Sequence, residues 1–161
     1  MLDQTAVRKG RKSKRQKQLE EFNNKYPIGW LNRSQLLEKV DDAYISMRND
    51  ELVSIGPRLT PSALEAIEWF ETEYAYLPIY LILDALIHEF YTNINAIKSY
   101  EFTADNIVKA TEYGAEKKQK VIKISKTCDL YLTKLSREFP KFNKSDVVNL
   151  VLITYKNYLN R

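Results

Sequence analysis

Several residue types are scarce in this chain of 161 residues, and each scarcity excludes a class of site. The single cysteine, Cys128, cannot form a disulfide within the chain, and the single histidine, His88, cannot supply a zinc cluster. Four glycines are too few and too scattered for a Gly-rich phosphate-binding loop. No apolar run approaches the roughly 18 residues of a membrane-spanning helix, and no apolar stretch follows the basic N-terminus as in a secretory signal. We therefore expect a cytoplasmic protein that is not an enzyme and has no catalytic residue, metal, cofactor or membrane contact.

The charged residues are segregated along the chain, although the formal net charge is only +4. Residues 1–18 carry a net charge of +6, residues 51–91 a net charge of −6, and residues 116–161 a net charge of +7. Two basic segments that flank an acidic one favour a polyanionic partner that is contacted by particular parts of the chain.

Residues 51–91 have the pattern of a strand followed by two helices. Apolar and polar residues alternate before Thr60, which is typical of a half-buried strand. Thr60 followed by Pro61 predicts the start of a helix, and Pro78 separates this helix from a second, very apolar one. Gly56 interrupts the strand together with the proline after it, and no polar residue caps the second helix.

The same order returns in residues 119–161. A short alternating strand precedes a helix, and Asn143 or Ser145 caps a last helix. The two stretches align with an offset of 65 residues through the strand and first helix, so that Arg58 corresponds to Lys123. In this alignment one extra residue in the second turn shifts the offset to 66 in the last helix. We interpret the match as an internal repeat.

The remaining segments follow from this repeat. We divide the chain into a basic flexible arm (1–18), an N-terminal helical segment (19–50), an acidic first repeat (51–91), a connector with a short helix (92–118) and a basic second repeat (119–161). Residues 32–37 have the same polar start as the last helix, which we interpret as a helix cap without a third repeat. We expect the single histidine and cysteine to be structural.

The sequences RLTPSALEAIEWF, IKISKTCDLYLTKL and FNKSDVVNLVL resemble the strand-to-helix junctions and second-helix start of the ribbon-helix-helix family of DNA-binding proteins, the Arc and MetJ type. Two copies in one chain resemble the TraY-type accessory proteins of conjugative plasmids. The resemblance implies a mainly α fold with a short two-stranded antiparallel β-ribbon, built by tandem repeats that form a pseudo-dimer. It also implies double-stranded DNA as the partner, bound by a monomer that acts as a pseudo-dimer or by a homo-oligomer.

Alternation along the strands assigns one face to the helices and the other to DNA. We expect the inward residues to be Ile55, Leu59, Ile122 and Ile124. The residues expected to read bases in the major groove are Ser54, Arg58, Gln119, Val121 and Lys123. Arginine and lysine can donate to guanine O6 and N7, and glutamine can pair with adenine. A narrow antiparallel ribbon fits into the major groove, where these side chains would reach base edges.

Two further groups are expected to contact the DNA backbone. The resemblance implies phosphate contacts near the helix starts, at Ser125, Asn143, Lys144 and Ser145. The basic arm adds seven cations that can follow the backbone or enter a minor groove, and these are Arg8, Lys9, Arg11, Lys12, Lys14, Arg15 and Lys17.

The biological role stays open among three alternatives. The tandem resemblance favours a relaxosome accessory that binds near an origin of transfer, with a relaxase or another DNA-processing protein as a partner. A transcriptional repressor of the ribbon-helix-helix type is the second alternative. The third is an antitoxin-like or plasmid-maintenance module that binds protein through the acidic residues 51–91.

Overall fold

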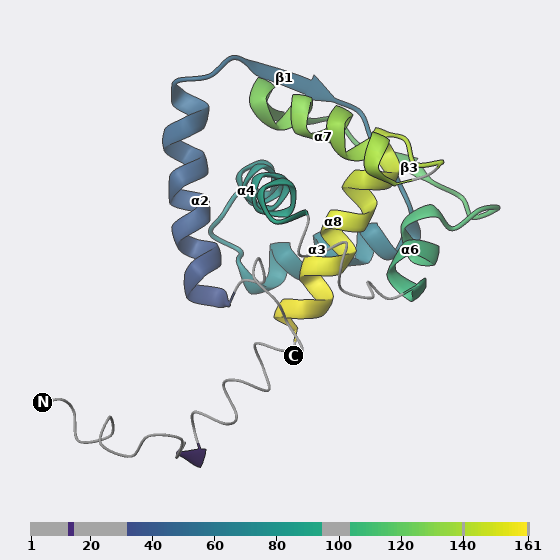
Figure 1. Ribbon diagram of the computed structural model, residues 1–161, viewed down its shortest axis with the longest axis horizontal. Helices are drawn as coiled ribbons and strands as arrows, with labels where there is room; N and C mark the ends of the chain where they lie inside the picture. Colours follow the sequence, from purple (N-terminus) through teal and green to yellow (C-terminus); the bar gives the residue numbers. More distant parts are fainter. Residues whose placement is uncertain (1–12, 15–31, 95–103, 140, 161) are drawn as a thin grey trace, which may run out of the picture.

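A computed structural model describes residues 13–14, 32–94, 104–139 and 141–160. In chain order the described elements are α2 (Arg33–Arg48), β1 (Leu52–Ile55), β2 (Arg58–Leu59), α3 (Pro61–Glu73), α4 (Ile79–Thr92), α6 (Ala104–Thr111), β3 (Lys118–Gln119), β4 (Ile122–Ser125), α7 (Lys126–Glu138) and α8 (Lys144–Leu159). The described chain is therefore mainly helical, with a small amount of antiparallel strand, as the sequence predicts (Figure 1). Among the described residues, no helix is both long enough and apolar enough to cross a lipid bilayer.

The four short strands pair across the two halves of the chain. β1 is antiparallel to β4, and β2 is antiparallel to β3. The register pairs Leu52 with Ser125, Ile55 with Ile122, Arg58 with Gln119 and Leu59 with Lys118. Between the two ladders, the N–H of Lys120 donates to the carbonyl of Pro57 at 3.2 Å. Residues 52–59 and 118–125 thus form one antiparallel ribbon in a single register, and Gly56 and Pro57 interrupt the first strand as expected.

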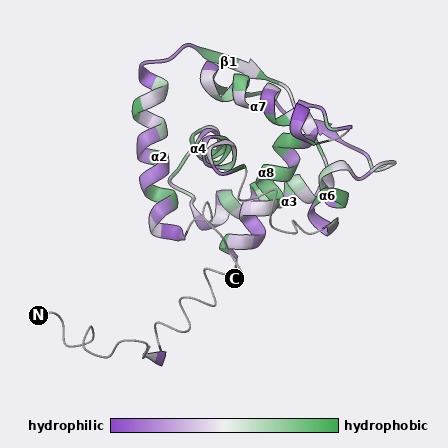
Figure 2. Ribbon diagram, viewed as in Figure 1, coloured by the Kyte–Doolittle hydropathy of each residue, from purple (hydrophilic) through white to green (hydrophobic). Residues whose placement is uncertain are grey.

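Each half of the chain packs its second helix against the first helix of the other half. α4 packs against α7, α8 and β4, whereas α8 packs against α3, α4, α7 and β2. α2 covers α4, and α6 covers α8 in the same way. The hydrophobic residues along α8 in Figure 2 belong to this shared core, in which Phe90 of α4 and Tyr155 of α8 meet edge to face. The core therefore lies between the two halves and depends on both.

Local capping accounts for where the helices begin. Thr60 accepts a hydrogen bond from the N–H of Ala63 at the start of α3. Asn143 starts α8 with a capping box, and Asn32 starts α2 with another, which confirms the cap predicted there. Pro78 precedes α4 without a side-chain cap. All four helix starts follow from residues that the sequence analysis singled out.

The bounds of the helices correct one expectation about the two halves. α3 and α7 contain 13 residues each and begin 65 residues apart, and α4 and α8 also begin 65 residues apart. The turns 74–78 and 139–143 are equally long, so the extra residue expected in the second turn is wrong. The misalignment arose because α4 and α8 are buried on nearly every side. A helix that is apolar all round has no polar face to set the phase of an alignment.

Candidate nucleic-acid interface

One face of the ribbon is open to solvent and carries the residues expected to face outward. The residues of this face, called the outer face below, are Ser54, Gly56, Arg58, Gln119, Val121 and Lys123, and all are exposed. On the opposite face Leu59, Ile122 and Ile124 are buried, and Ile55 is half-buried. The inward and outward sides predicted from strand alternation are therefore confirmed.

The two cations of the outer face stand at opposite ends and on opposite strands. Arg58 opposes Gln119 near one end, and Lys123 opposes Ser54 near the other. Val121, whose side chain is 69% exposed, lies between them. The outer face thus presents a long cationic donor beside a short or neutral polar side chain at each end, with an apolar group in the middle. Such groups can donate to guanine and contact the methyl group of thymine.

The side chain of Gln119 lies across the ribbon. Its amide Nε2 donates to the carbonyl oxygen of Gly56 at 3.2 Å. A Cβ atom at position 56 would lie 2.5 Å from this Nε2, so the bond depends on glycine there. A contact between Gln119 and a base requires the exchange of this exposed hydrogen bond, which contributes about 1 kcal/mol.

The start of α8 is fixed beside the Arg58 end of the ribbon. The backbone N–H of Arg58 donates to the hydroxyl oxygen of Ser145 at 3.0 Å. Lys144 forms an ion pair with Asp129 of α7, and its side chain keeps 43% of its exposure. Lys144, Ser145 and Ser54 line one shallow pocket between the ribbon, α7 and α8. The structure therefore brings the predicted α8 residues next to the predicted ribbon residues.

Ser125 is the predicted phosphate residue that the structure removes from the surface. It is 3% exposed, and its hydroxyl oxygen accepts from the N–H of Cys128 to cap α7. Its own N–H and hydroxyl donate to one carboxylate oxygen of Asp84, at 2.8 Å and 2.9 Å. The prediction of a phosphate contact at Ser125 does not fit this burial, because the cap faces the interior instead of solvent.

Asn149 holds the other end of the ribbon from inside, and sequence reasoning missed it. This residue of α8 is 0% exposed. Its Oδ1 accepts from the N–H of Thr60 at 3.4 Å, and its Nδ2 donates to the carbonyls of Arg58 and Ala110, both at 3.1 Å. One side chain thus joins β2, the start of α3 and the end of α6. The available signal was a lone amide within an apolar helix, where a buried polar group requires partners.

Two acidic side chains outside the ribbon fix the starts of α3 and α7. The Oδ2 of Asp50 accepts from the N–H and hydroxyl of Thr127, at 3.1 Å and 2.8 Å. These two hydrogen bonds are the main reason that the pKa of Asp50 lies below its usual value. In the other half, the Oε1 of Glu112 accepts from the N–H of Ser62 at 3.2 Å. Each strand is therefore preceded by a carboxylate that is bonded to the first turn of the other half's helix.

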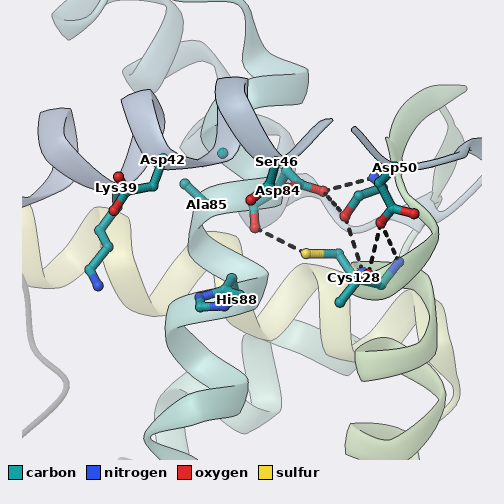
Figure 3. A pocket seen from close by; sticks show the side chains of 11 residues that line it. Lys39, Asp42, Ser46, Asp50, Asp84, Ala85, His88 and Cys128 are labelled. Carbon is teal, nitrogen blue, oxygen red and sulfur yellow. Dashed lines mark hydrogen bonds between the residues drawn. The ribbon is translucent and has the colours of Figure 1, made fainter. Parts of the chain in front are cut away.

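A small cavity lies where α2, α4 and the start of α7 meet (Figure 3). Asp50, Asp84, His88 and Cys128 are among its lining residues. The thiol of Cys128 donates to the backbone carbonyl of Asp84 at 3.3 Å, and burial raises the pKa of the thiol well above its usual value. Both carboxylates are already engaged with α7, so the cavity is built from capping groups. Within the described residues, no group of His, Cys, Asp and Glu side chains could hold a metal ion.

The basic arm falls almost entirely outside the described residues. Lys14 is described and is exposed. The other predicted arm residues, Arg8, Lys9, Arg11, Lys12, Arg15 and Lys17, lie outside that part of the chain. The N-terminal segment predicted over 19–50 is described from Asn32 onward, where it forms α2.

The described surface therefore offers one continuous polar face, formed by the outer face of the ribbon and the first turn of α8. Its chemistry is that of cationic and amide donors on extended backbone beside a helix start, a combination that can contact both base edges and phosphates. No protein-family model, no curated protein and no solved structure matches this chain.

Proposed function

We propose that this protein binds double-stranded DNA in a sequence-specific manner and inserts its ribbon into the major groove. The observation that carries the proposal is the single strand register, which opposes Arg58 to Gln119 and Ser54 to Lys123 on one exposed face. A two-stranded ribbon matches the major groove, which is about 12 Å wide. The burial of the opposite face of the ribbon is consistent with this orientation, because only the outer face is free to meet a ligand.

We also propose that the chain is a tandem ribbon-helix-helix protein whose two repeats act as a pseudo-dimer. The constant offset of 65 residues between matched helices supports this interpretation. In the observed register, Gly56 and Val121 are the cross-strand pair whose members also differ by this offset, so they would lie on the pseudo-two-fold axis. The bonds from Asn149 to Thr60 and from Asp84 to Ser125 are a second matched pair, one from each half to the other.

Phosphate contacts would be unequal on the two sides of this ribbon. The start of α8 offers Asn143, Lys144 and Ser145, whereas α4 starts at Pro78 without a side-chain cap. The basic arm would add contacts that do not depend on sequence. The acidic first repeat would contribute Arg58 to base recognition and otherwise complete the fold.

For the biological role, we favour a cytoplasmic relaxosome accessory that binds an origin of transfer together with a relaxase or another DNA-processing protein. A transcriptional repressor would use the same ribbon and differ only in the location of its site. A protein-interaction module is supported by one observation, the exposed carboxylates of Glu65, Glu68 and Glu71 on α3. These acids would meet a basic partner and not DNA.

Selection from a pool of random duplexes, followed by gel shifts at several salt concentrations, tests the DNA proposal. We expect enrichment of one sequence and a steep fall of affinity with salt, since phosphate contacts release counterions. Lys123→Ala should reduce the preference for the selected site over random duplex by about tenfold, as expected for loss of a base contact. Lys134→Ala, which removes a cation from α7, is the matched control and should leave that preference unchanged.

Two outcomes would contradict the proposal. If no duplex is enriched or bound at low salt, the protein does not bind double-stranded DNA. If Lys123→Ala weakens binding to selected and random duplexes equally, the ribbon does not read bases, because a contact to phosphate lowers all affinities alike. Gel shifts with fragments from the genomic neighbourhood of the gene would then separate the origin-binding role from the repressor role.

A further inference from the structure

The two halves of the chain differ in the connection that leads into the ribbon. Asp50 and Glu112 are matched anchors, because each accepts a hydrogen bond from the first turn of α7 or α3. Leu52 begins the first strand two residues after its anchor. Its counterpart 65 residues later is Lys117, which follows its anchor by five residues. The second connection therefore contains three additional residues, and residues 113–117 are called the 113–117 loop below.

The 113–117 loop projects beyond the body of the molecule at the end of the ribbon where β3 begins (Figure 1). Its backbone is shaped by Glu112 and Gly114, with φ angles of +36° and +87°. A turn bond from the N–H of Ala115 to the carbonyl of Glu112, 2.9 Å long, closes its base. The carboxylate bond from Glu112 to α3 then ties that base to the core. The loop thus has a defined base although it is far from the core.

An aromatic and a cationic side chain are paired on the loop. Tyr113 is 78% exposed, the largest exposed fraction among the described large hydrophobic residues. The ammonium of Lys117 lies 5.9 Å from the centre of the Tyr113 ring. A tyrosine hydroxyl and a lysine ammonium are both common donors to DNA phosphates. Burial of this ring against DNA would also remove apolar surface from water.

The loop is connected to the outer face without an intervening element. It continues into Lys118 and Gln119, and Gln119 opposes Arg58 on the outer face. A duplex that lies against the outer face is much longer than the ribbon, so it continues past both ends. Past the Arg58 end it would meet the 113–117 loop. Past the other end the short connection between Asp50 and Leu52 has no comparable loop.

We propose that the 113–117 loop is a second DNA contact, in which Tyr113 and Lys117 bind the phosphate backbone on one flank of the site that the ribbon reads. This inference rests on the DNA-binding function proposed above. It adds that the bound segment of DNA is one-sided, extending farther beyond the base pairs read by Arg58 than beyond those read by Lys123. A two-fold symmetric contact on both flanks is not expected, because the loop belongs to one half only.

The experiment compares the full protein with the Tyr113→Ala, Lys117→Ala double variant on a set of selected duplexes. One duplex has both flanks, and two others each lack one flank. The flank beyond Arg58 is identified by the base pairs at which Arg58→Ala changes the selected sequence. Both substitutions leave Glu112 and Gly114 in place, and a thermal melt followed by circular dichroism confirms that the variant is folded.

We expect the double variant to bind the full duplex roughly five- to tenfold more weakly, with a salt slope reduced by about 1 for the lost lysine contact. On the duplex that lacks the Arg58 flank, the variant and the wild-type protein should bind equally. Lys134→Ala is the control, because Lys134 also lies over a tyrosine ring, 5.8 Å from that of Tyr91 on the helical side of the molecule. It should leave affinity for every duplex unchanged.

Several results would overturn the inference. If the double variant binds the full duplex as tightly as the wild-type protein, the loop does not contact DNA. If the variant loses the same affinity on all duplexes, the loop acts on the ribbon and not on a flank. In both cases wild-type binding survives, so the proposed function stands without the loop contact. If the wild-type protein binds no duplex, the proposed function fails and the loop contact fails with it.

Discussion

The carboxylate of Asp84 accepts two hydrogen bonds from Ser125, from its backbone N–H at 2.8 Å and from its hydroxyl at 2.9 Å. Both residues are buried, with exposures of 2% and 3%. Asp84 lies on α4 of the first half, and Ser125 is the last strand residue of the second half. The first half therefore holds the strand-to-helix junction of the second, and an acidic group is well placed beside the start of a helix.

Removal of the Asp84 side chain should destabilise the fold strongly. Asp84→Ala leaves the N–H and hydroxyl of Ser125 without their buried acceptor, at a cost of about 3 kcal/mol in the free energy of unfolding. Asp84→Asn keeps one acceptor oxygen and should cost only about 1 kcal/mol. Urea denaturation measures both values. Asp105→Ala, which removes an exposed partner of Lys109, is the control, and an equally small loss for Asp84→Ala would contradict the assignment.

The matched residue on α8 should respond in the opposite way to the exchange of amide and carboxylate. Asn149 donates two hydrogen bonds, to the carbonyls of Arg58 and Ala110. Asn149→Asp would turn a carboxylate oxygen toward both carbonyls in a fully buried place, and we expect a loss above about 3 kcal/mol. Denaturation of Asn149→Asp alongside Asp84→Asn tests this contrast. Similar losses for the two exchanges would show that the two side chains are held by equivalent partners.

Acid should weaken the fold in part through Asp50. The hydrogen bonds from Thr127 lower the pKa of this carboxyl in the folded protein. Because the unfolded value is near 3.9, the stabilisation from Asp50 is complete above about pH 4 and is lost as the pH falls through the folded pKa. Asp50→Asn removes this dependence. The difference in unfolding free energy between wild type and Asp50→Asn should thus be larger near about pH 6 than near about pH 3, and a constant difference would exclude this role.

Alanine at position 56 should be tolerated by the fold but should displace Gln119. The new Cβ would lie 2.5 Å from the Nε2 of Gln119, the mobile end of a long side chain. Loss of the exposed bond to Gly56 is offset by the lower backbone entropy of alanine in the unfolded chain, which contributes about 0.5–1 kcal/mol. We expect Gly56→Ala to change the unfolding free energy by less than about 0.5 kcal/mol. A loss several times larger in urea denaturation would show that the ribbon backbone, and not Gln119, meets the methyl group.

Much of the ribbon was predictable because strand alternation is a local property. Alternating residues identified the buried Ile122 and Ile124 and the exposed Arg58 and Lys123. The helix caps at Thr60 and at the start of α8 were predictable for the same reason, since a cap bonds to an N–H only a few residues away. Predictions that depended on the phase of the two most apolar helices failed, as the offset of 66 shows.

The sequence by itself determined the order of strands and helices, the two sides of each strand and the separation of acidic from basic segments. The tertiary structure decided which strands pair, in which register, and which polar groups become buried between the halves. Ser125 illustrates the difference: its sequence context predicts a helix cap, but only packing against α4 turns that cap inward to Asp84. The physical reason is that alternation and capping are local, whereas burial depends on contacts between residues far apart in the chain.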